Sequence, residues 1–180
     1  MKLNYKSFLT AATLMVVGAN ANAGLVWDIY AGGNVGVGSM ALFTDDNFRD
    51  RSAQSYGVLA GIDLPVVRFE GEYNWLDSKN LDMQIAMANA YVKFGSPIII
   101  NPYIGVGVGM MLDAESTMHI DIDPSIAYQA MLGLTFNLPV IPFKIDVEGR
   151  ALYIPELYSV GGIDFGATQY EGRVKLRLVF

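Results

Sequence analysis

The last eleven residues, 170–180, constrain the fold of this chain more than any other stretch. Apolar residues or glycine occupy every second position, and the positions between them include Glu171, Arg173, Lys175 and Arg177. Successive side chains of a β-strand point to opposite faces, so this segment predicts a strand with one apolar face and one charged face. A transmembrane β-barrel satisfies both faces, with lipid outside and a polar interior. An amphipathic strand in a soluble sandwich is the alternative interpretation.

The amino-terminal 23 residues (1–23) have the features of a cleavable secretory signal peptide. Lys2 and Lys6 form a positive region, and a short, mostly apolar segment follows at residues 8–17. Ala21-Asn22-Ala23 then fits the small-x-small pattern of a cleavage site. Because the apolar segment is too short to span a bilayer comfortably, we expect cleavage rather than a membrane anchor.

Residues 24–180 are therefore predicted to form one exported domain. Removal of the two signal-peptide lysines leaves 10 basic against 18 acidic residues, a net charge of −8, which argues against a nucleic-acid partner. No apolar run is long enough for a transmembrane helix, so any span must be made by strands. The chain contains no cysteine, which excludes disulfides and thiolate chemistry.

Alternating residues and turn signals divide this domain into eight expected strands. The alternation is clear over 66–75 and 143–153, whereas over 81–94 the apolar residues change phase. A β-bulge near Met87–Asn89 would reconcile the two phases, with a helix as the rival interpretation. Short turns alternate with longer loops, among them 38–53 and 155–166, so both chain ends are expected on the same side. The eight segments are 26–37, 55–62, 66–75, 81–94, 98–112, 125–136, 143–153 and 170–180.

The polar faces of four expected strands carry a balanced set of charges. The acids are Asp28, Glu70, Glu72, Asp146, Glu148 and Glu171, and the bases are Arg68, Lys144, Arg150, Arg173, Lys175 and Arg177. Balance suits a closed interior, because an enclosed charge is costly unless it is paired. Slipping the last strand by one residue would instead expose four charges to lipid, at about 2–4 kcal/mol for each Arg or Lys near the midplane.

Specific pairs follow from the expected strand order. Asp146 and Glu148 are expected near Arg173 and Lys175, because their strands are neighbours, and closure of the barrel would bring Asp28 to Arg177. Glycines alternate with apolar residues over 104–110 and leave room inside for long charged side chains. The predicted fold class is all-β: an eight-stranded antiparallel up-and-down transmembrane β-barrel with an interior filled by side chains.

Three segments carry a resemblance to a known family: the signal ending Ala21-Asn22-Ala23, the strand 102–109, and the terminal Leu176-Arg177-Leu178-Val179-Phe180. The sequence resembles the small eight-stranded outer-membrane barrels, the OmpA/OmpX-like and opacity-type surface antigens. This resemblance implies export to the periplasm and a place in the outer membrane of a Gram-negative bacterium. It also implies contact with outer-membrane lipid and lipopolysaccharide, and a role for Phe180 as a signal to the barrel-assembly machinery.

Three functions are consistent with such a barrel. The first is a non-enzymatic structural or surface-interaction role through extracellular loops, with an unidentified extracellular ligand and no cofactor. The second is a narrow channel for small solutes. The third is a lipid A-modifying acyl hydrolase or transferase, which would need a histidine near a nucleophile and an acid. His119 is the only histidine, with Ser116 and Asp121 nearby, but a solvated loop histidine is the simpler interpretation.

An acidic segment offers weak candidates for a metal site. Its carboxylates belong to Asp113, Glu115, Asp121 and Asp123. Such groups are hard oxygen ligands that suit Ca²⁺, but the glycine of an EF-hand loop is missing. A solvated acidic loop is the simpler interpretation, and we expect weak Ca²⁺ binding at most.

Overall fold

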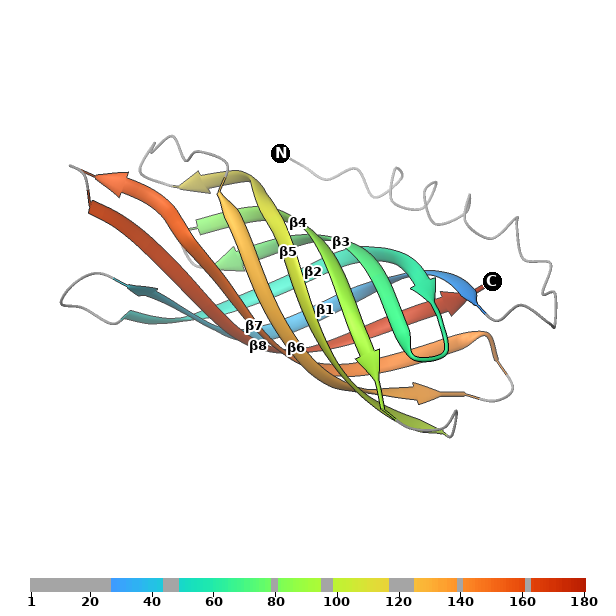
Figure 1. Cartoon of the computed structure of the whole chain (residues 1–180). Helices are drawn as coiled ribbons and strands as arrows, with labels where there is room; N and C mark the ends of the chain where they lie inside the picture. Colours follow the sequence, from blue (N-terminus) through green and yellow to red (C-terminus); the bar gives the residue numbers. More distant parts are fainter. Residues whose placement is uncertain are drawn as a thin grey trace, which may run out of the picture.

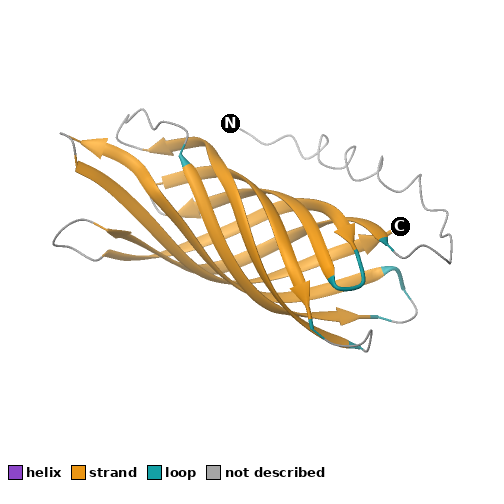
Figure 2. Cartoon of the chain, in the orientation of Figure 1, coloured by secondary structure: helices purple, strands orange, loops and turns teal. Residues whose placement is uncertain are grey.

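The computed structural model describes residues 27–43, 49–78, 81–94, 99–116, 125–138, 141–160 and 163–180, which form a closed antiparallel β-barrel (Figures 1 and 2). Each strand pairs with the next in sequence, and β8 pairs with β1, as the sequence predicts. The predicted signal peptide lies outside the described residues. The strands are β1 (Asp28–Phe43), β2 (Arg49–Asp63), β3 (Val67–Ser78), β4 (Leu81–Lys93), β5 (Ile100–Ser116), β6 (Ile126–Asn137), β7 (Phe143–Val160) and β8 (Ile163–Val179).

The strands are staggered around the barrel. Following the paired residues from Tyr30 of β1 once around the barrel leads back to β1 at Met40, ten residues further along. This shear corresponds to a strand tilt of about 40°. The oblique course of the strands is visible in Figure 1.

The two ends of the barrel differ. At the terminal rim, where β1 begins and β8 ends, the β2–β3, β4–β5 and β6–β7 connections are short, and the Leu64 amide donates to the Val67 carbonyl over 2.9 Å. At the opposite end, the distal rim, β7 and β8 extend over residues that we expected to form a loop at 155–166, and β1 and β2 over much of 38–53. Those two expectations are wrong, because the charged residues within 38–53 and the proline and glycines within 155–166 are turn signals that interrupt the alternation in the sequence.

The expected bulge near Met87–Asn89 is also wrong. The buried residues of β4 alternate without interruption: Met83, Ile85, Met87, Asn89 and Tyr91. The phase of the apolar residues changes because the interior itself changes from apolar at the distal end to polar at the terminal end. The register shift of this strand pair lies elsewhere, between Gln84 and Ile85, where β5 has the extra residue.

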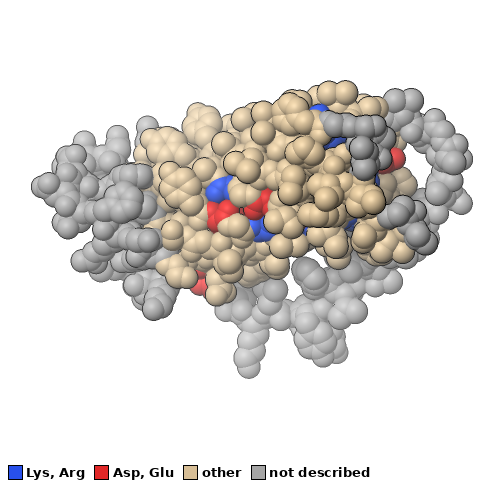
Figure 3. Space-filling view, turned by 90° about the horizontal axis from the view of Figure 1, so that it is seen from below, with Lys and Arg blue, Asp and Glu red and all other residues tan. Residues whose placement is uncertain are grey.

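The outer wall is apolar and exposed. In β7 the outward residues Phe143 and Tyr153 stand ten positions apart, about 33 Å along the strand and about 25 Å along the barrel axis at this tilt. That height matches the apolar band of a membrane barrel, which aromatic residues flank at both edges. Figure 3 shows one face that is mostly uncharged, with a few acidic and basic atoms near its middle and toward its ends. No helix among the described residues is long and apolar enough to span a membrane.

Tyrosine rings cover the inward glycines. Tyr91 lies opposite Gly105, and a Cβ atom built on Gly105 would stand 2.3 Å from the Tyr91 ring. Tyr103 lies opposite Gly133 in the same way, and a Cβ atom there would stand 2.6 Å from the Tyr103 ring. The sequence predicted room for long charged side chains at the glycines of β5, but at Gly105 an aromatic ring occupies that room.

Two glycine substitutions should therefore show that an added methyl group lowers stability at an inward position but not at an outward one. We expect Gly105→Ala to lower the free energy of unfolding by about 1–3 kcal/mol, because Tyr91 must move out of its packed position. Gly172→Ala is the matched control, since its Cβ meets nothing within 4 Å. Urea-induced unfolding in lipid vesicles measures both variants, and equal destabilisation would contradict this account of the glycines.

Candidate functional site

The inward side chains form two tiers. The charged tier lies toward the terminal rim and holds seven acids and seven bases. Its members are Asp28, Asp63, Arg68, Glu70, Glu72, Lys93, Lys144, Asp146, Glu148, Arg150, Glu171, Arg173, Lys175 and Arg177. Ten of the twelve charged residues that the sequence placed on the polar faces are buried in this tier, and Lys144 and Asp28 lie at the rim with side chains 22% and 44% exposed.

Two of the ion pairs between the neighbouring strands β7 and β8 form between residues that stand directly opposite each other. The Arg173 Nε atom lies 2.5 Å from Glu148 Oε1, and Arg150 Nη2 lies 2.7 Å from Glu171 Oε1. Both pairs are register partners, so the ladder itself brings the opposite charges together. All four side chains are fully buried.

Other ion pairs cross the lumen. Arg68 of β3 reaches Asp146 of β7, on the opposite side of the barrel, at 3.0 Å. Arg173 of β8 donates two hydrogen bonds to Glu72 of β3, each 3.1 Å long. The side chains of both pairs are 0% exposed, so charged groups fill the described interior at this level.

Lys175 is the hub of the charged tier. Its ammonium group lies 2.8 Å from Glu70, 2.6 Å from Glu72 and 3.3 Å from Glu148. It also donates to the Tyr91 hydroxyl over 2.9 Å, and that hydroxyl donates to Glu70 over 2.8 Å. A single cation therefore holds together three carboxylates that would otherwise repel one another in a medium of low dielectric constant.

Three tyrosines complete the network, and the sequence reasoning missed them. Tyr30 donates to Glu70 over 2.8 Å, and Tyr103 donates to Glu148 over 2.9 Å. The Arg68 guanidinium lies over the rings of Tyr91 and Tyr103, 4.0 and 4.6 Å from their centroids. Such cation–π contacts stabilise a buried guanidinium that lacks a second carboxylate. The alternation of the sequence could have found them, because each of these tyrosines stands at an inward-facing position of its strand, as the charged residues do.

The terminal rim holds charges that we paired incorrectly. We expected Asp28 beside Arg177, but Asp28 lies 3.3 Å from Lys144, and Arg177 donates to Asp146 over 2.8 Å. The stagger of the strands is the reason, since the register partner of Arg177 on β1 is Gly32, four residues past Asp28.

Asp63 and Lys93 at the terminal rim were not predicted from the sequence, because they stand at the edges of turns. Asp63 accepts hydrogen bonds from Lys93, from Lys144 over 3.0 Å and from Arg177 over 3.4 Å. Three cations therefore share the carboxylate of the last residue of β2.

The apolar tier lies toward the distal rim. Its buried members are Met40, Ala53, Leu76, Met83, Ile85, Met87, Met111, Ala127, Leu152, Ile154 and Ala167. They come from every strand of the barrel, so they form a continuous layer across the lumen. This layer was not predicted, because inward residues of a membrane barrel are expected to be polar.

The candidate metal and catalytic residues remain untested. Asp113 and Glu115 belong to the distal part of β5, whereas His119, Asp121 and Asp123 lie outside the described residues. Among the residues that the structure describes, no group of three or more His, Cys, Asp or Glu side chains is placed to hold a metal ion.

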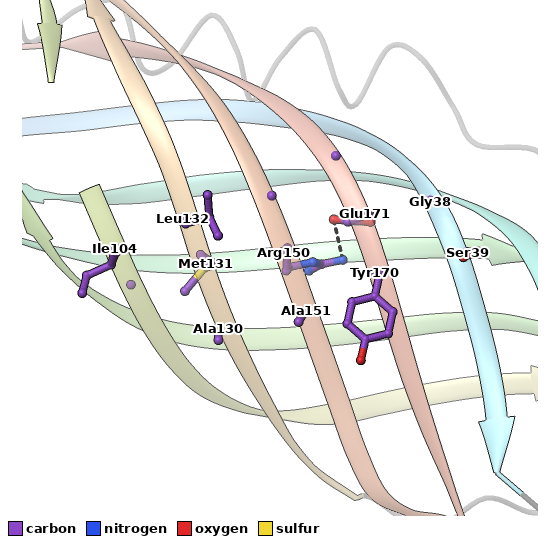
Figure 4. Close-up of a pocket in the computed structure, with 13 residues that line it drawn as sticks. Gly38, Ser39, Ile104, Ala130, Met131, Leu132, Arg150, Ala151, Tyr170 and Glu171 are labelled. Atoms are coloured by element: carbon purple, nitrogen blue, oxygen red, sulfur yellow. Dashed lines mark ion pairs between the residues drawn. The ribbon is translucent and has the colours of Figure 1, made fainter. Parts of the chain in front are cut away.

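A shallow depression of about 770 Å³ lies on the outer wall, and Figure 4 shows its lining. Residues of β1, β5, β6, β7 and β8 line it, among them Ala130, Leu132, Ala151 and Tyr170 on the outer side of the wall. The ion pair of Arg150 and Glu171, drawn as a dashed line in Figure 4, belongs to the inner side of this wall. The depression is therefore a feature of the apolar surface rather than an entrance to the lumen.

Solved structures share this architecture. Neisserial surface protein A superposes with a TM-score of 0.62 at 14% sequence identity, covering 82% of this chain and 96% of that one. The fold is that of the small eight-stranded outer-membrane β-barrels. The outer-membrane enzyme PagL superposes with a TM-score of 0.50 at 15% identity, covering 79% and 97% of the two chains. No protein-family model and no curated protein matches the sequence.

Substitution of the hub lysine tests the energetics of the charged tier. Lys175→Met keeps most of the length of the side chain but leaves Glu70, Glu72 and Glu148 without the cation that contacts all three. We expect the free energy of unfolding to fall by about 3–5 kcal/mol. Lys144→Met is the matched control at the partly exposed rim, with an expected loss below about 1 kcal/mol. Urea-induced unfolding measures both, and a Lys175→Met variant as stable as the Lys144→Met variant would contradict the role of the hub.

Proposed function

We propose that this chain is a non-enzymatic outer-membrane β-barrel protein of a Gram-negative bacterium, with a closed barrel as scaffold and an interaction surface on its distal connections. The observation that carries this proposal is the set of fully buried ion pairs that cross the lumen, Arg68 with Asp146 and Arg173 with Glu72. A lumen filled in this way supports the barrel from within and leaves no path for solutes through the described interior.

The outer wall supports the location in a membrane. Large apolar side chains such as Val106 and Leu132 are about two-thirds exposed, which is unfavourable in water and favourable in lipid. The apolar band of about 25 Å suits an outer membrane. We accordingly propose outer-membrane lipid and lipopolysaccharide as the surroundings of the wall, with Phe180 read by the barrel-assembly machinery during insertion after export to the periplasm.

The distal rim is the proposed outer surface. In membrane barrels the short turns face the periplasm and the longer connections face the outside. The start of β1, the end of β8 and the β2–β3, β4–β5 and β6–β7 turns share the terminal rim here, and the longest connection, at residues 117–125, lies at the distal rim. The connections that follow β1, β3, β5 and β7 therefore face outward, and they are the proposed site for an extracellular ligand.

The two alternatives have weaker support. A narrow channel requires a gap in the charged tier, whose crossing pairs are 0% exposed. A lipid A-modifying enzyme is favoured by no observation on the described residues, and only the fold that this chain shares with the outer-membrane enzyme PagL is consistent with an enzymatic role. Retention of lipid A modification by a His119→Ala variant would exclude that histidine.

Epitope insertion tests location and orientation together. We expect an epitope placed between residues 44 and 48, in the β1–β2 connection, to bind antibody on intact cells. The same epitope placed between residues 138 and 141, in the β6–β7 turn at the terminal rim, is the matched control and should bind only after the outer membrane is opened. Heat-modifiable migration on a gel verifies that both variants are folded. Antibody binding at the β6–β7 turn of intact cells would contradict the orientation, and recovery in the soluble fraction would contradict the location.

A further inference from the structure

The apolar tier is unusual for the inside of such a barrel. The interior of an outer-membrane barrel is polar, because water, ions or charged networks occupy it. Here eleven apolar side chains, all at most 4% exposed, close the lumen above the charged tier. Their position next to the distal rim places them nearest to the proposed outer surface.

The composition of the tier favours adaptability. Four of its residues are methionines, Met40, Met83, Met87 and Met111, and three are alanines. Methionine has three rotatable bonds and a polarisable thioether, so it repacks easily and is common at surfaces that accept varied apolar ligands. All eleven side chains of the tier are buried as the structure stands. A ligand would therefore enter the tier only if methionine side chains rearrange. Ala53 and Ala127 have small side chains, so little side-chain volume has to move near them.

One polar group within the tier lacks a partner. Gln169 of β8 is 1% exposed, and its register partners are Met40 of β1 and Leu152 of β7, both members of the tier. Its Nε2 atom donates to Glu171 over 2.9 Å, but its Oε1 atom has no hydrogen-bond partner among the described residues. A buried acceptor without a donor is unfavourable, so Gln169 Oε1 can accept a hydrogen bond from a group that the described residues do not supply.

We propose that the apolar tier binds a small, largely apolar molecule that carries one hydrogen-bond donor. The donor bonds to Gln169 Oε1, and the apolar body packs among the side chains of Met40, Met83 and Met111. This is the combination that defines many ligand sites, namely an apolar lining with a single placed polar group. The inference does not rest on the proposed surface role, because it concerns the lumen rather than the connections.

Indole and indene form a matched pair of probes. The two molecules have nearly the same size and shape, but only indole has an N–H donor. A site with one unmet acceptor should prefer indole roughly tenfold, since one hydrogen bond separates the two complexes. An ordinary apolar cavity would bind both equally.

The methionine methyl groups provide a readout that partitioning of the probe into lipid does not imitate. Met111 is 1% exposed and faces the tier, whereas its neighbour Met110 is 52% exposed on the outer wall. With ¹³C-methyl methionine in the barrel in lipid nanodiscs, we expect saturable shifts of the Met40, Met83 and Met111 signals as indole is added. The Met110 signal should change in proportion to probe concentration, without saturation.

Two variants locate the site. Gln169→Met removes the acceptor and should reduce the preference for indole over indene to about one. Ala127→Leu fills the tier and should abolish saturable shifts with both probes. Gln54→Met, the same exchange at an exposed position, should leave the binding of indole unchanged. The proposal is overturned if the inward methyl signals do not saturate with indole. In that case a buried water, rather than a ligand, would donate to Gln169 Oε1. It is equally overturned if Gln169→Met retains the full preference.

Discussion

The pairing of charges inside a closed wall is the constraint on which this structure depends. Ionised side chains on the inner face have neither bulk water nor lipid headgroups to solvate them, so each requires a partner of opposite charge within reach. Seven acids and seven bases meet that requirement. A one-residue slip of β8 would turn Arg173, Lys175 and Arg177 outward and leave their partners unpaired, so the network specifies the register of the strand that closes the barrel.

The stagger of the strands decides which partners meet. Because the strands are tilted, a charge on one wall reaches across to a residue of a distant strand, as Arg68 reaches Asp146 and Lys175 reaches Glu70. These contacts join parts of the chain more than 70 residues apart and tie together opposite walls of the barrel. The tyrosine rings that cover glycines on neighbouring strands bring hydroxyl donors to the same carboxylates. Aromatic packing and ion pairing therefore stabilise the same level of the barrel.

Much of this fold follows from the sequence by a simple physical rule. Apolar and charged residues alternate over β3, β7 and β8, and a strand with such faces needs an apolar medium on one side and paired charges on the other. The rule predicted the eight strands, their order and the inward direction of residues such as Glu72 and Lys175. It gave no information on stagger, because stagger depends on backbone pairing around the whole barrel. The pairing of Asp28 with Arg177 was wrong for that reason.

The remaining differences have local causes. Asp63 and Lys93 stand where strands meet turns, so their faces were ambiguous in the sequence. On β4 the inward residues change from Met83 and Ile85 to Asn89 and Tyr91, and this change within one continuous face looked like a bulge. An apolar tier inside a membrane barrel is an exception to the rule that the inward residues of such a barrel are polar. The tier forms where inward residues from all eight strands meet in one layer, and no single stretch of the sequence shows this.

The exchange of the Lys175 ammonium protons with water tests the central claim most directly. Lys175 is sealed among Glu70, Glu72 and Glu148, whereas Lys144 at the rim has a side chain that is 22% exposed. In the ¹⁵N NMR spectrum of the folded barrel in lipid, a paired and dehydrated lumen predicts a resolved Lys175 ammonium signal whose protons exchange much more slowly than those of Lys144. Equally fast exchange at both lysines would show that water fills the lumen, and it would contradict a barrel closed by its own charges.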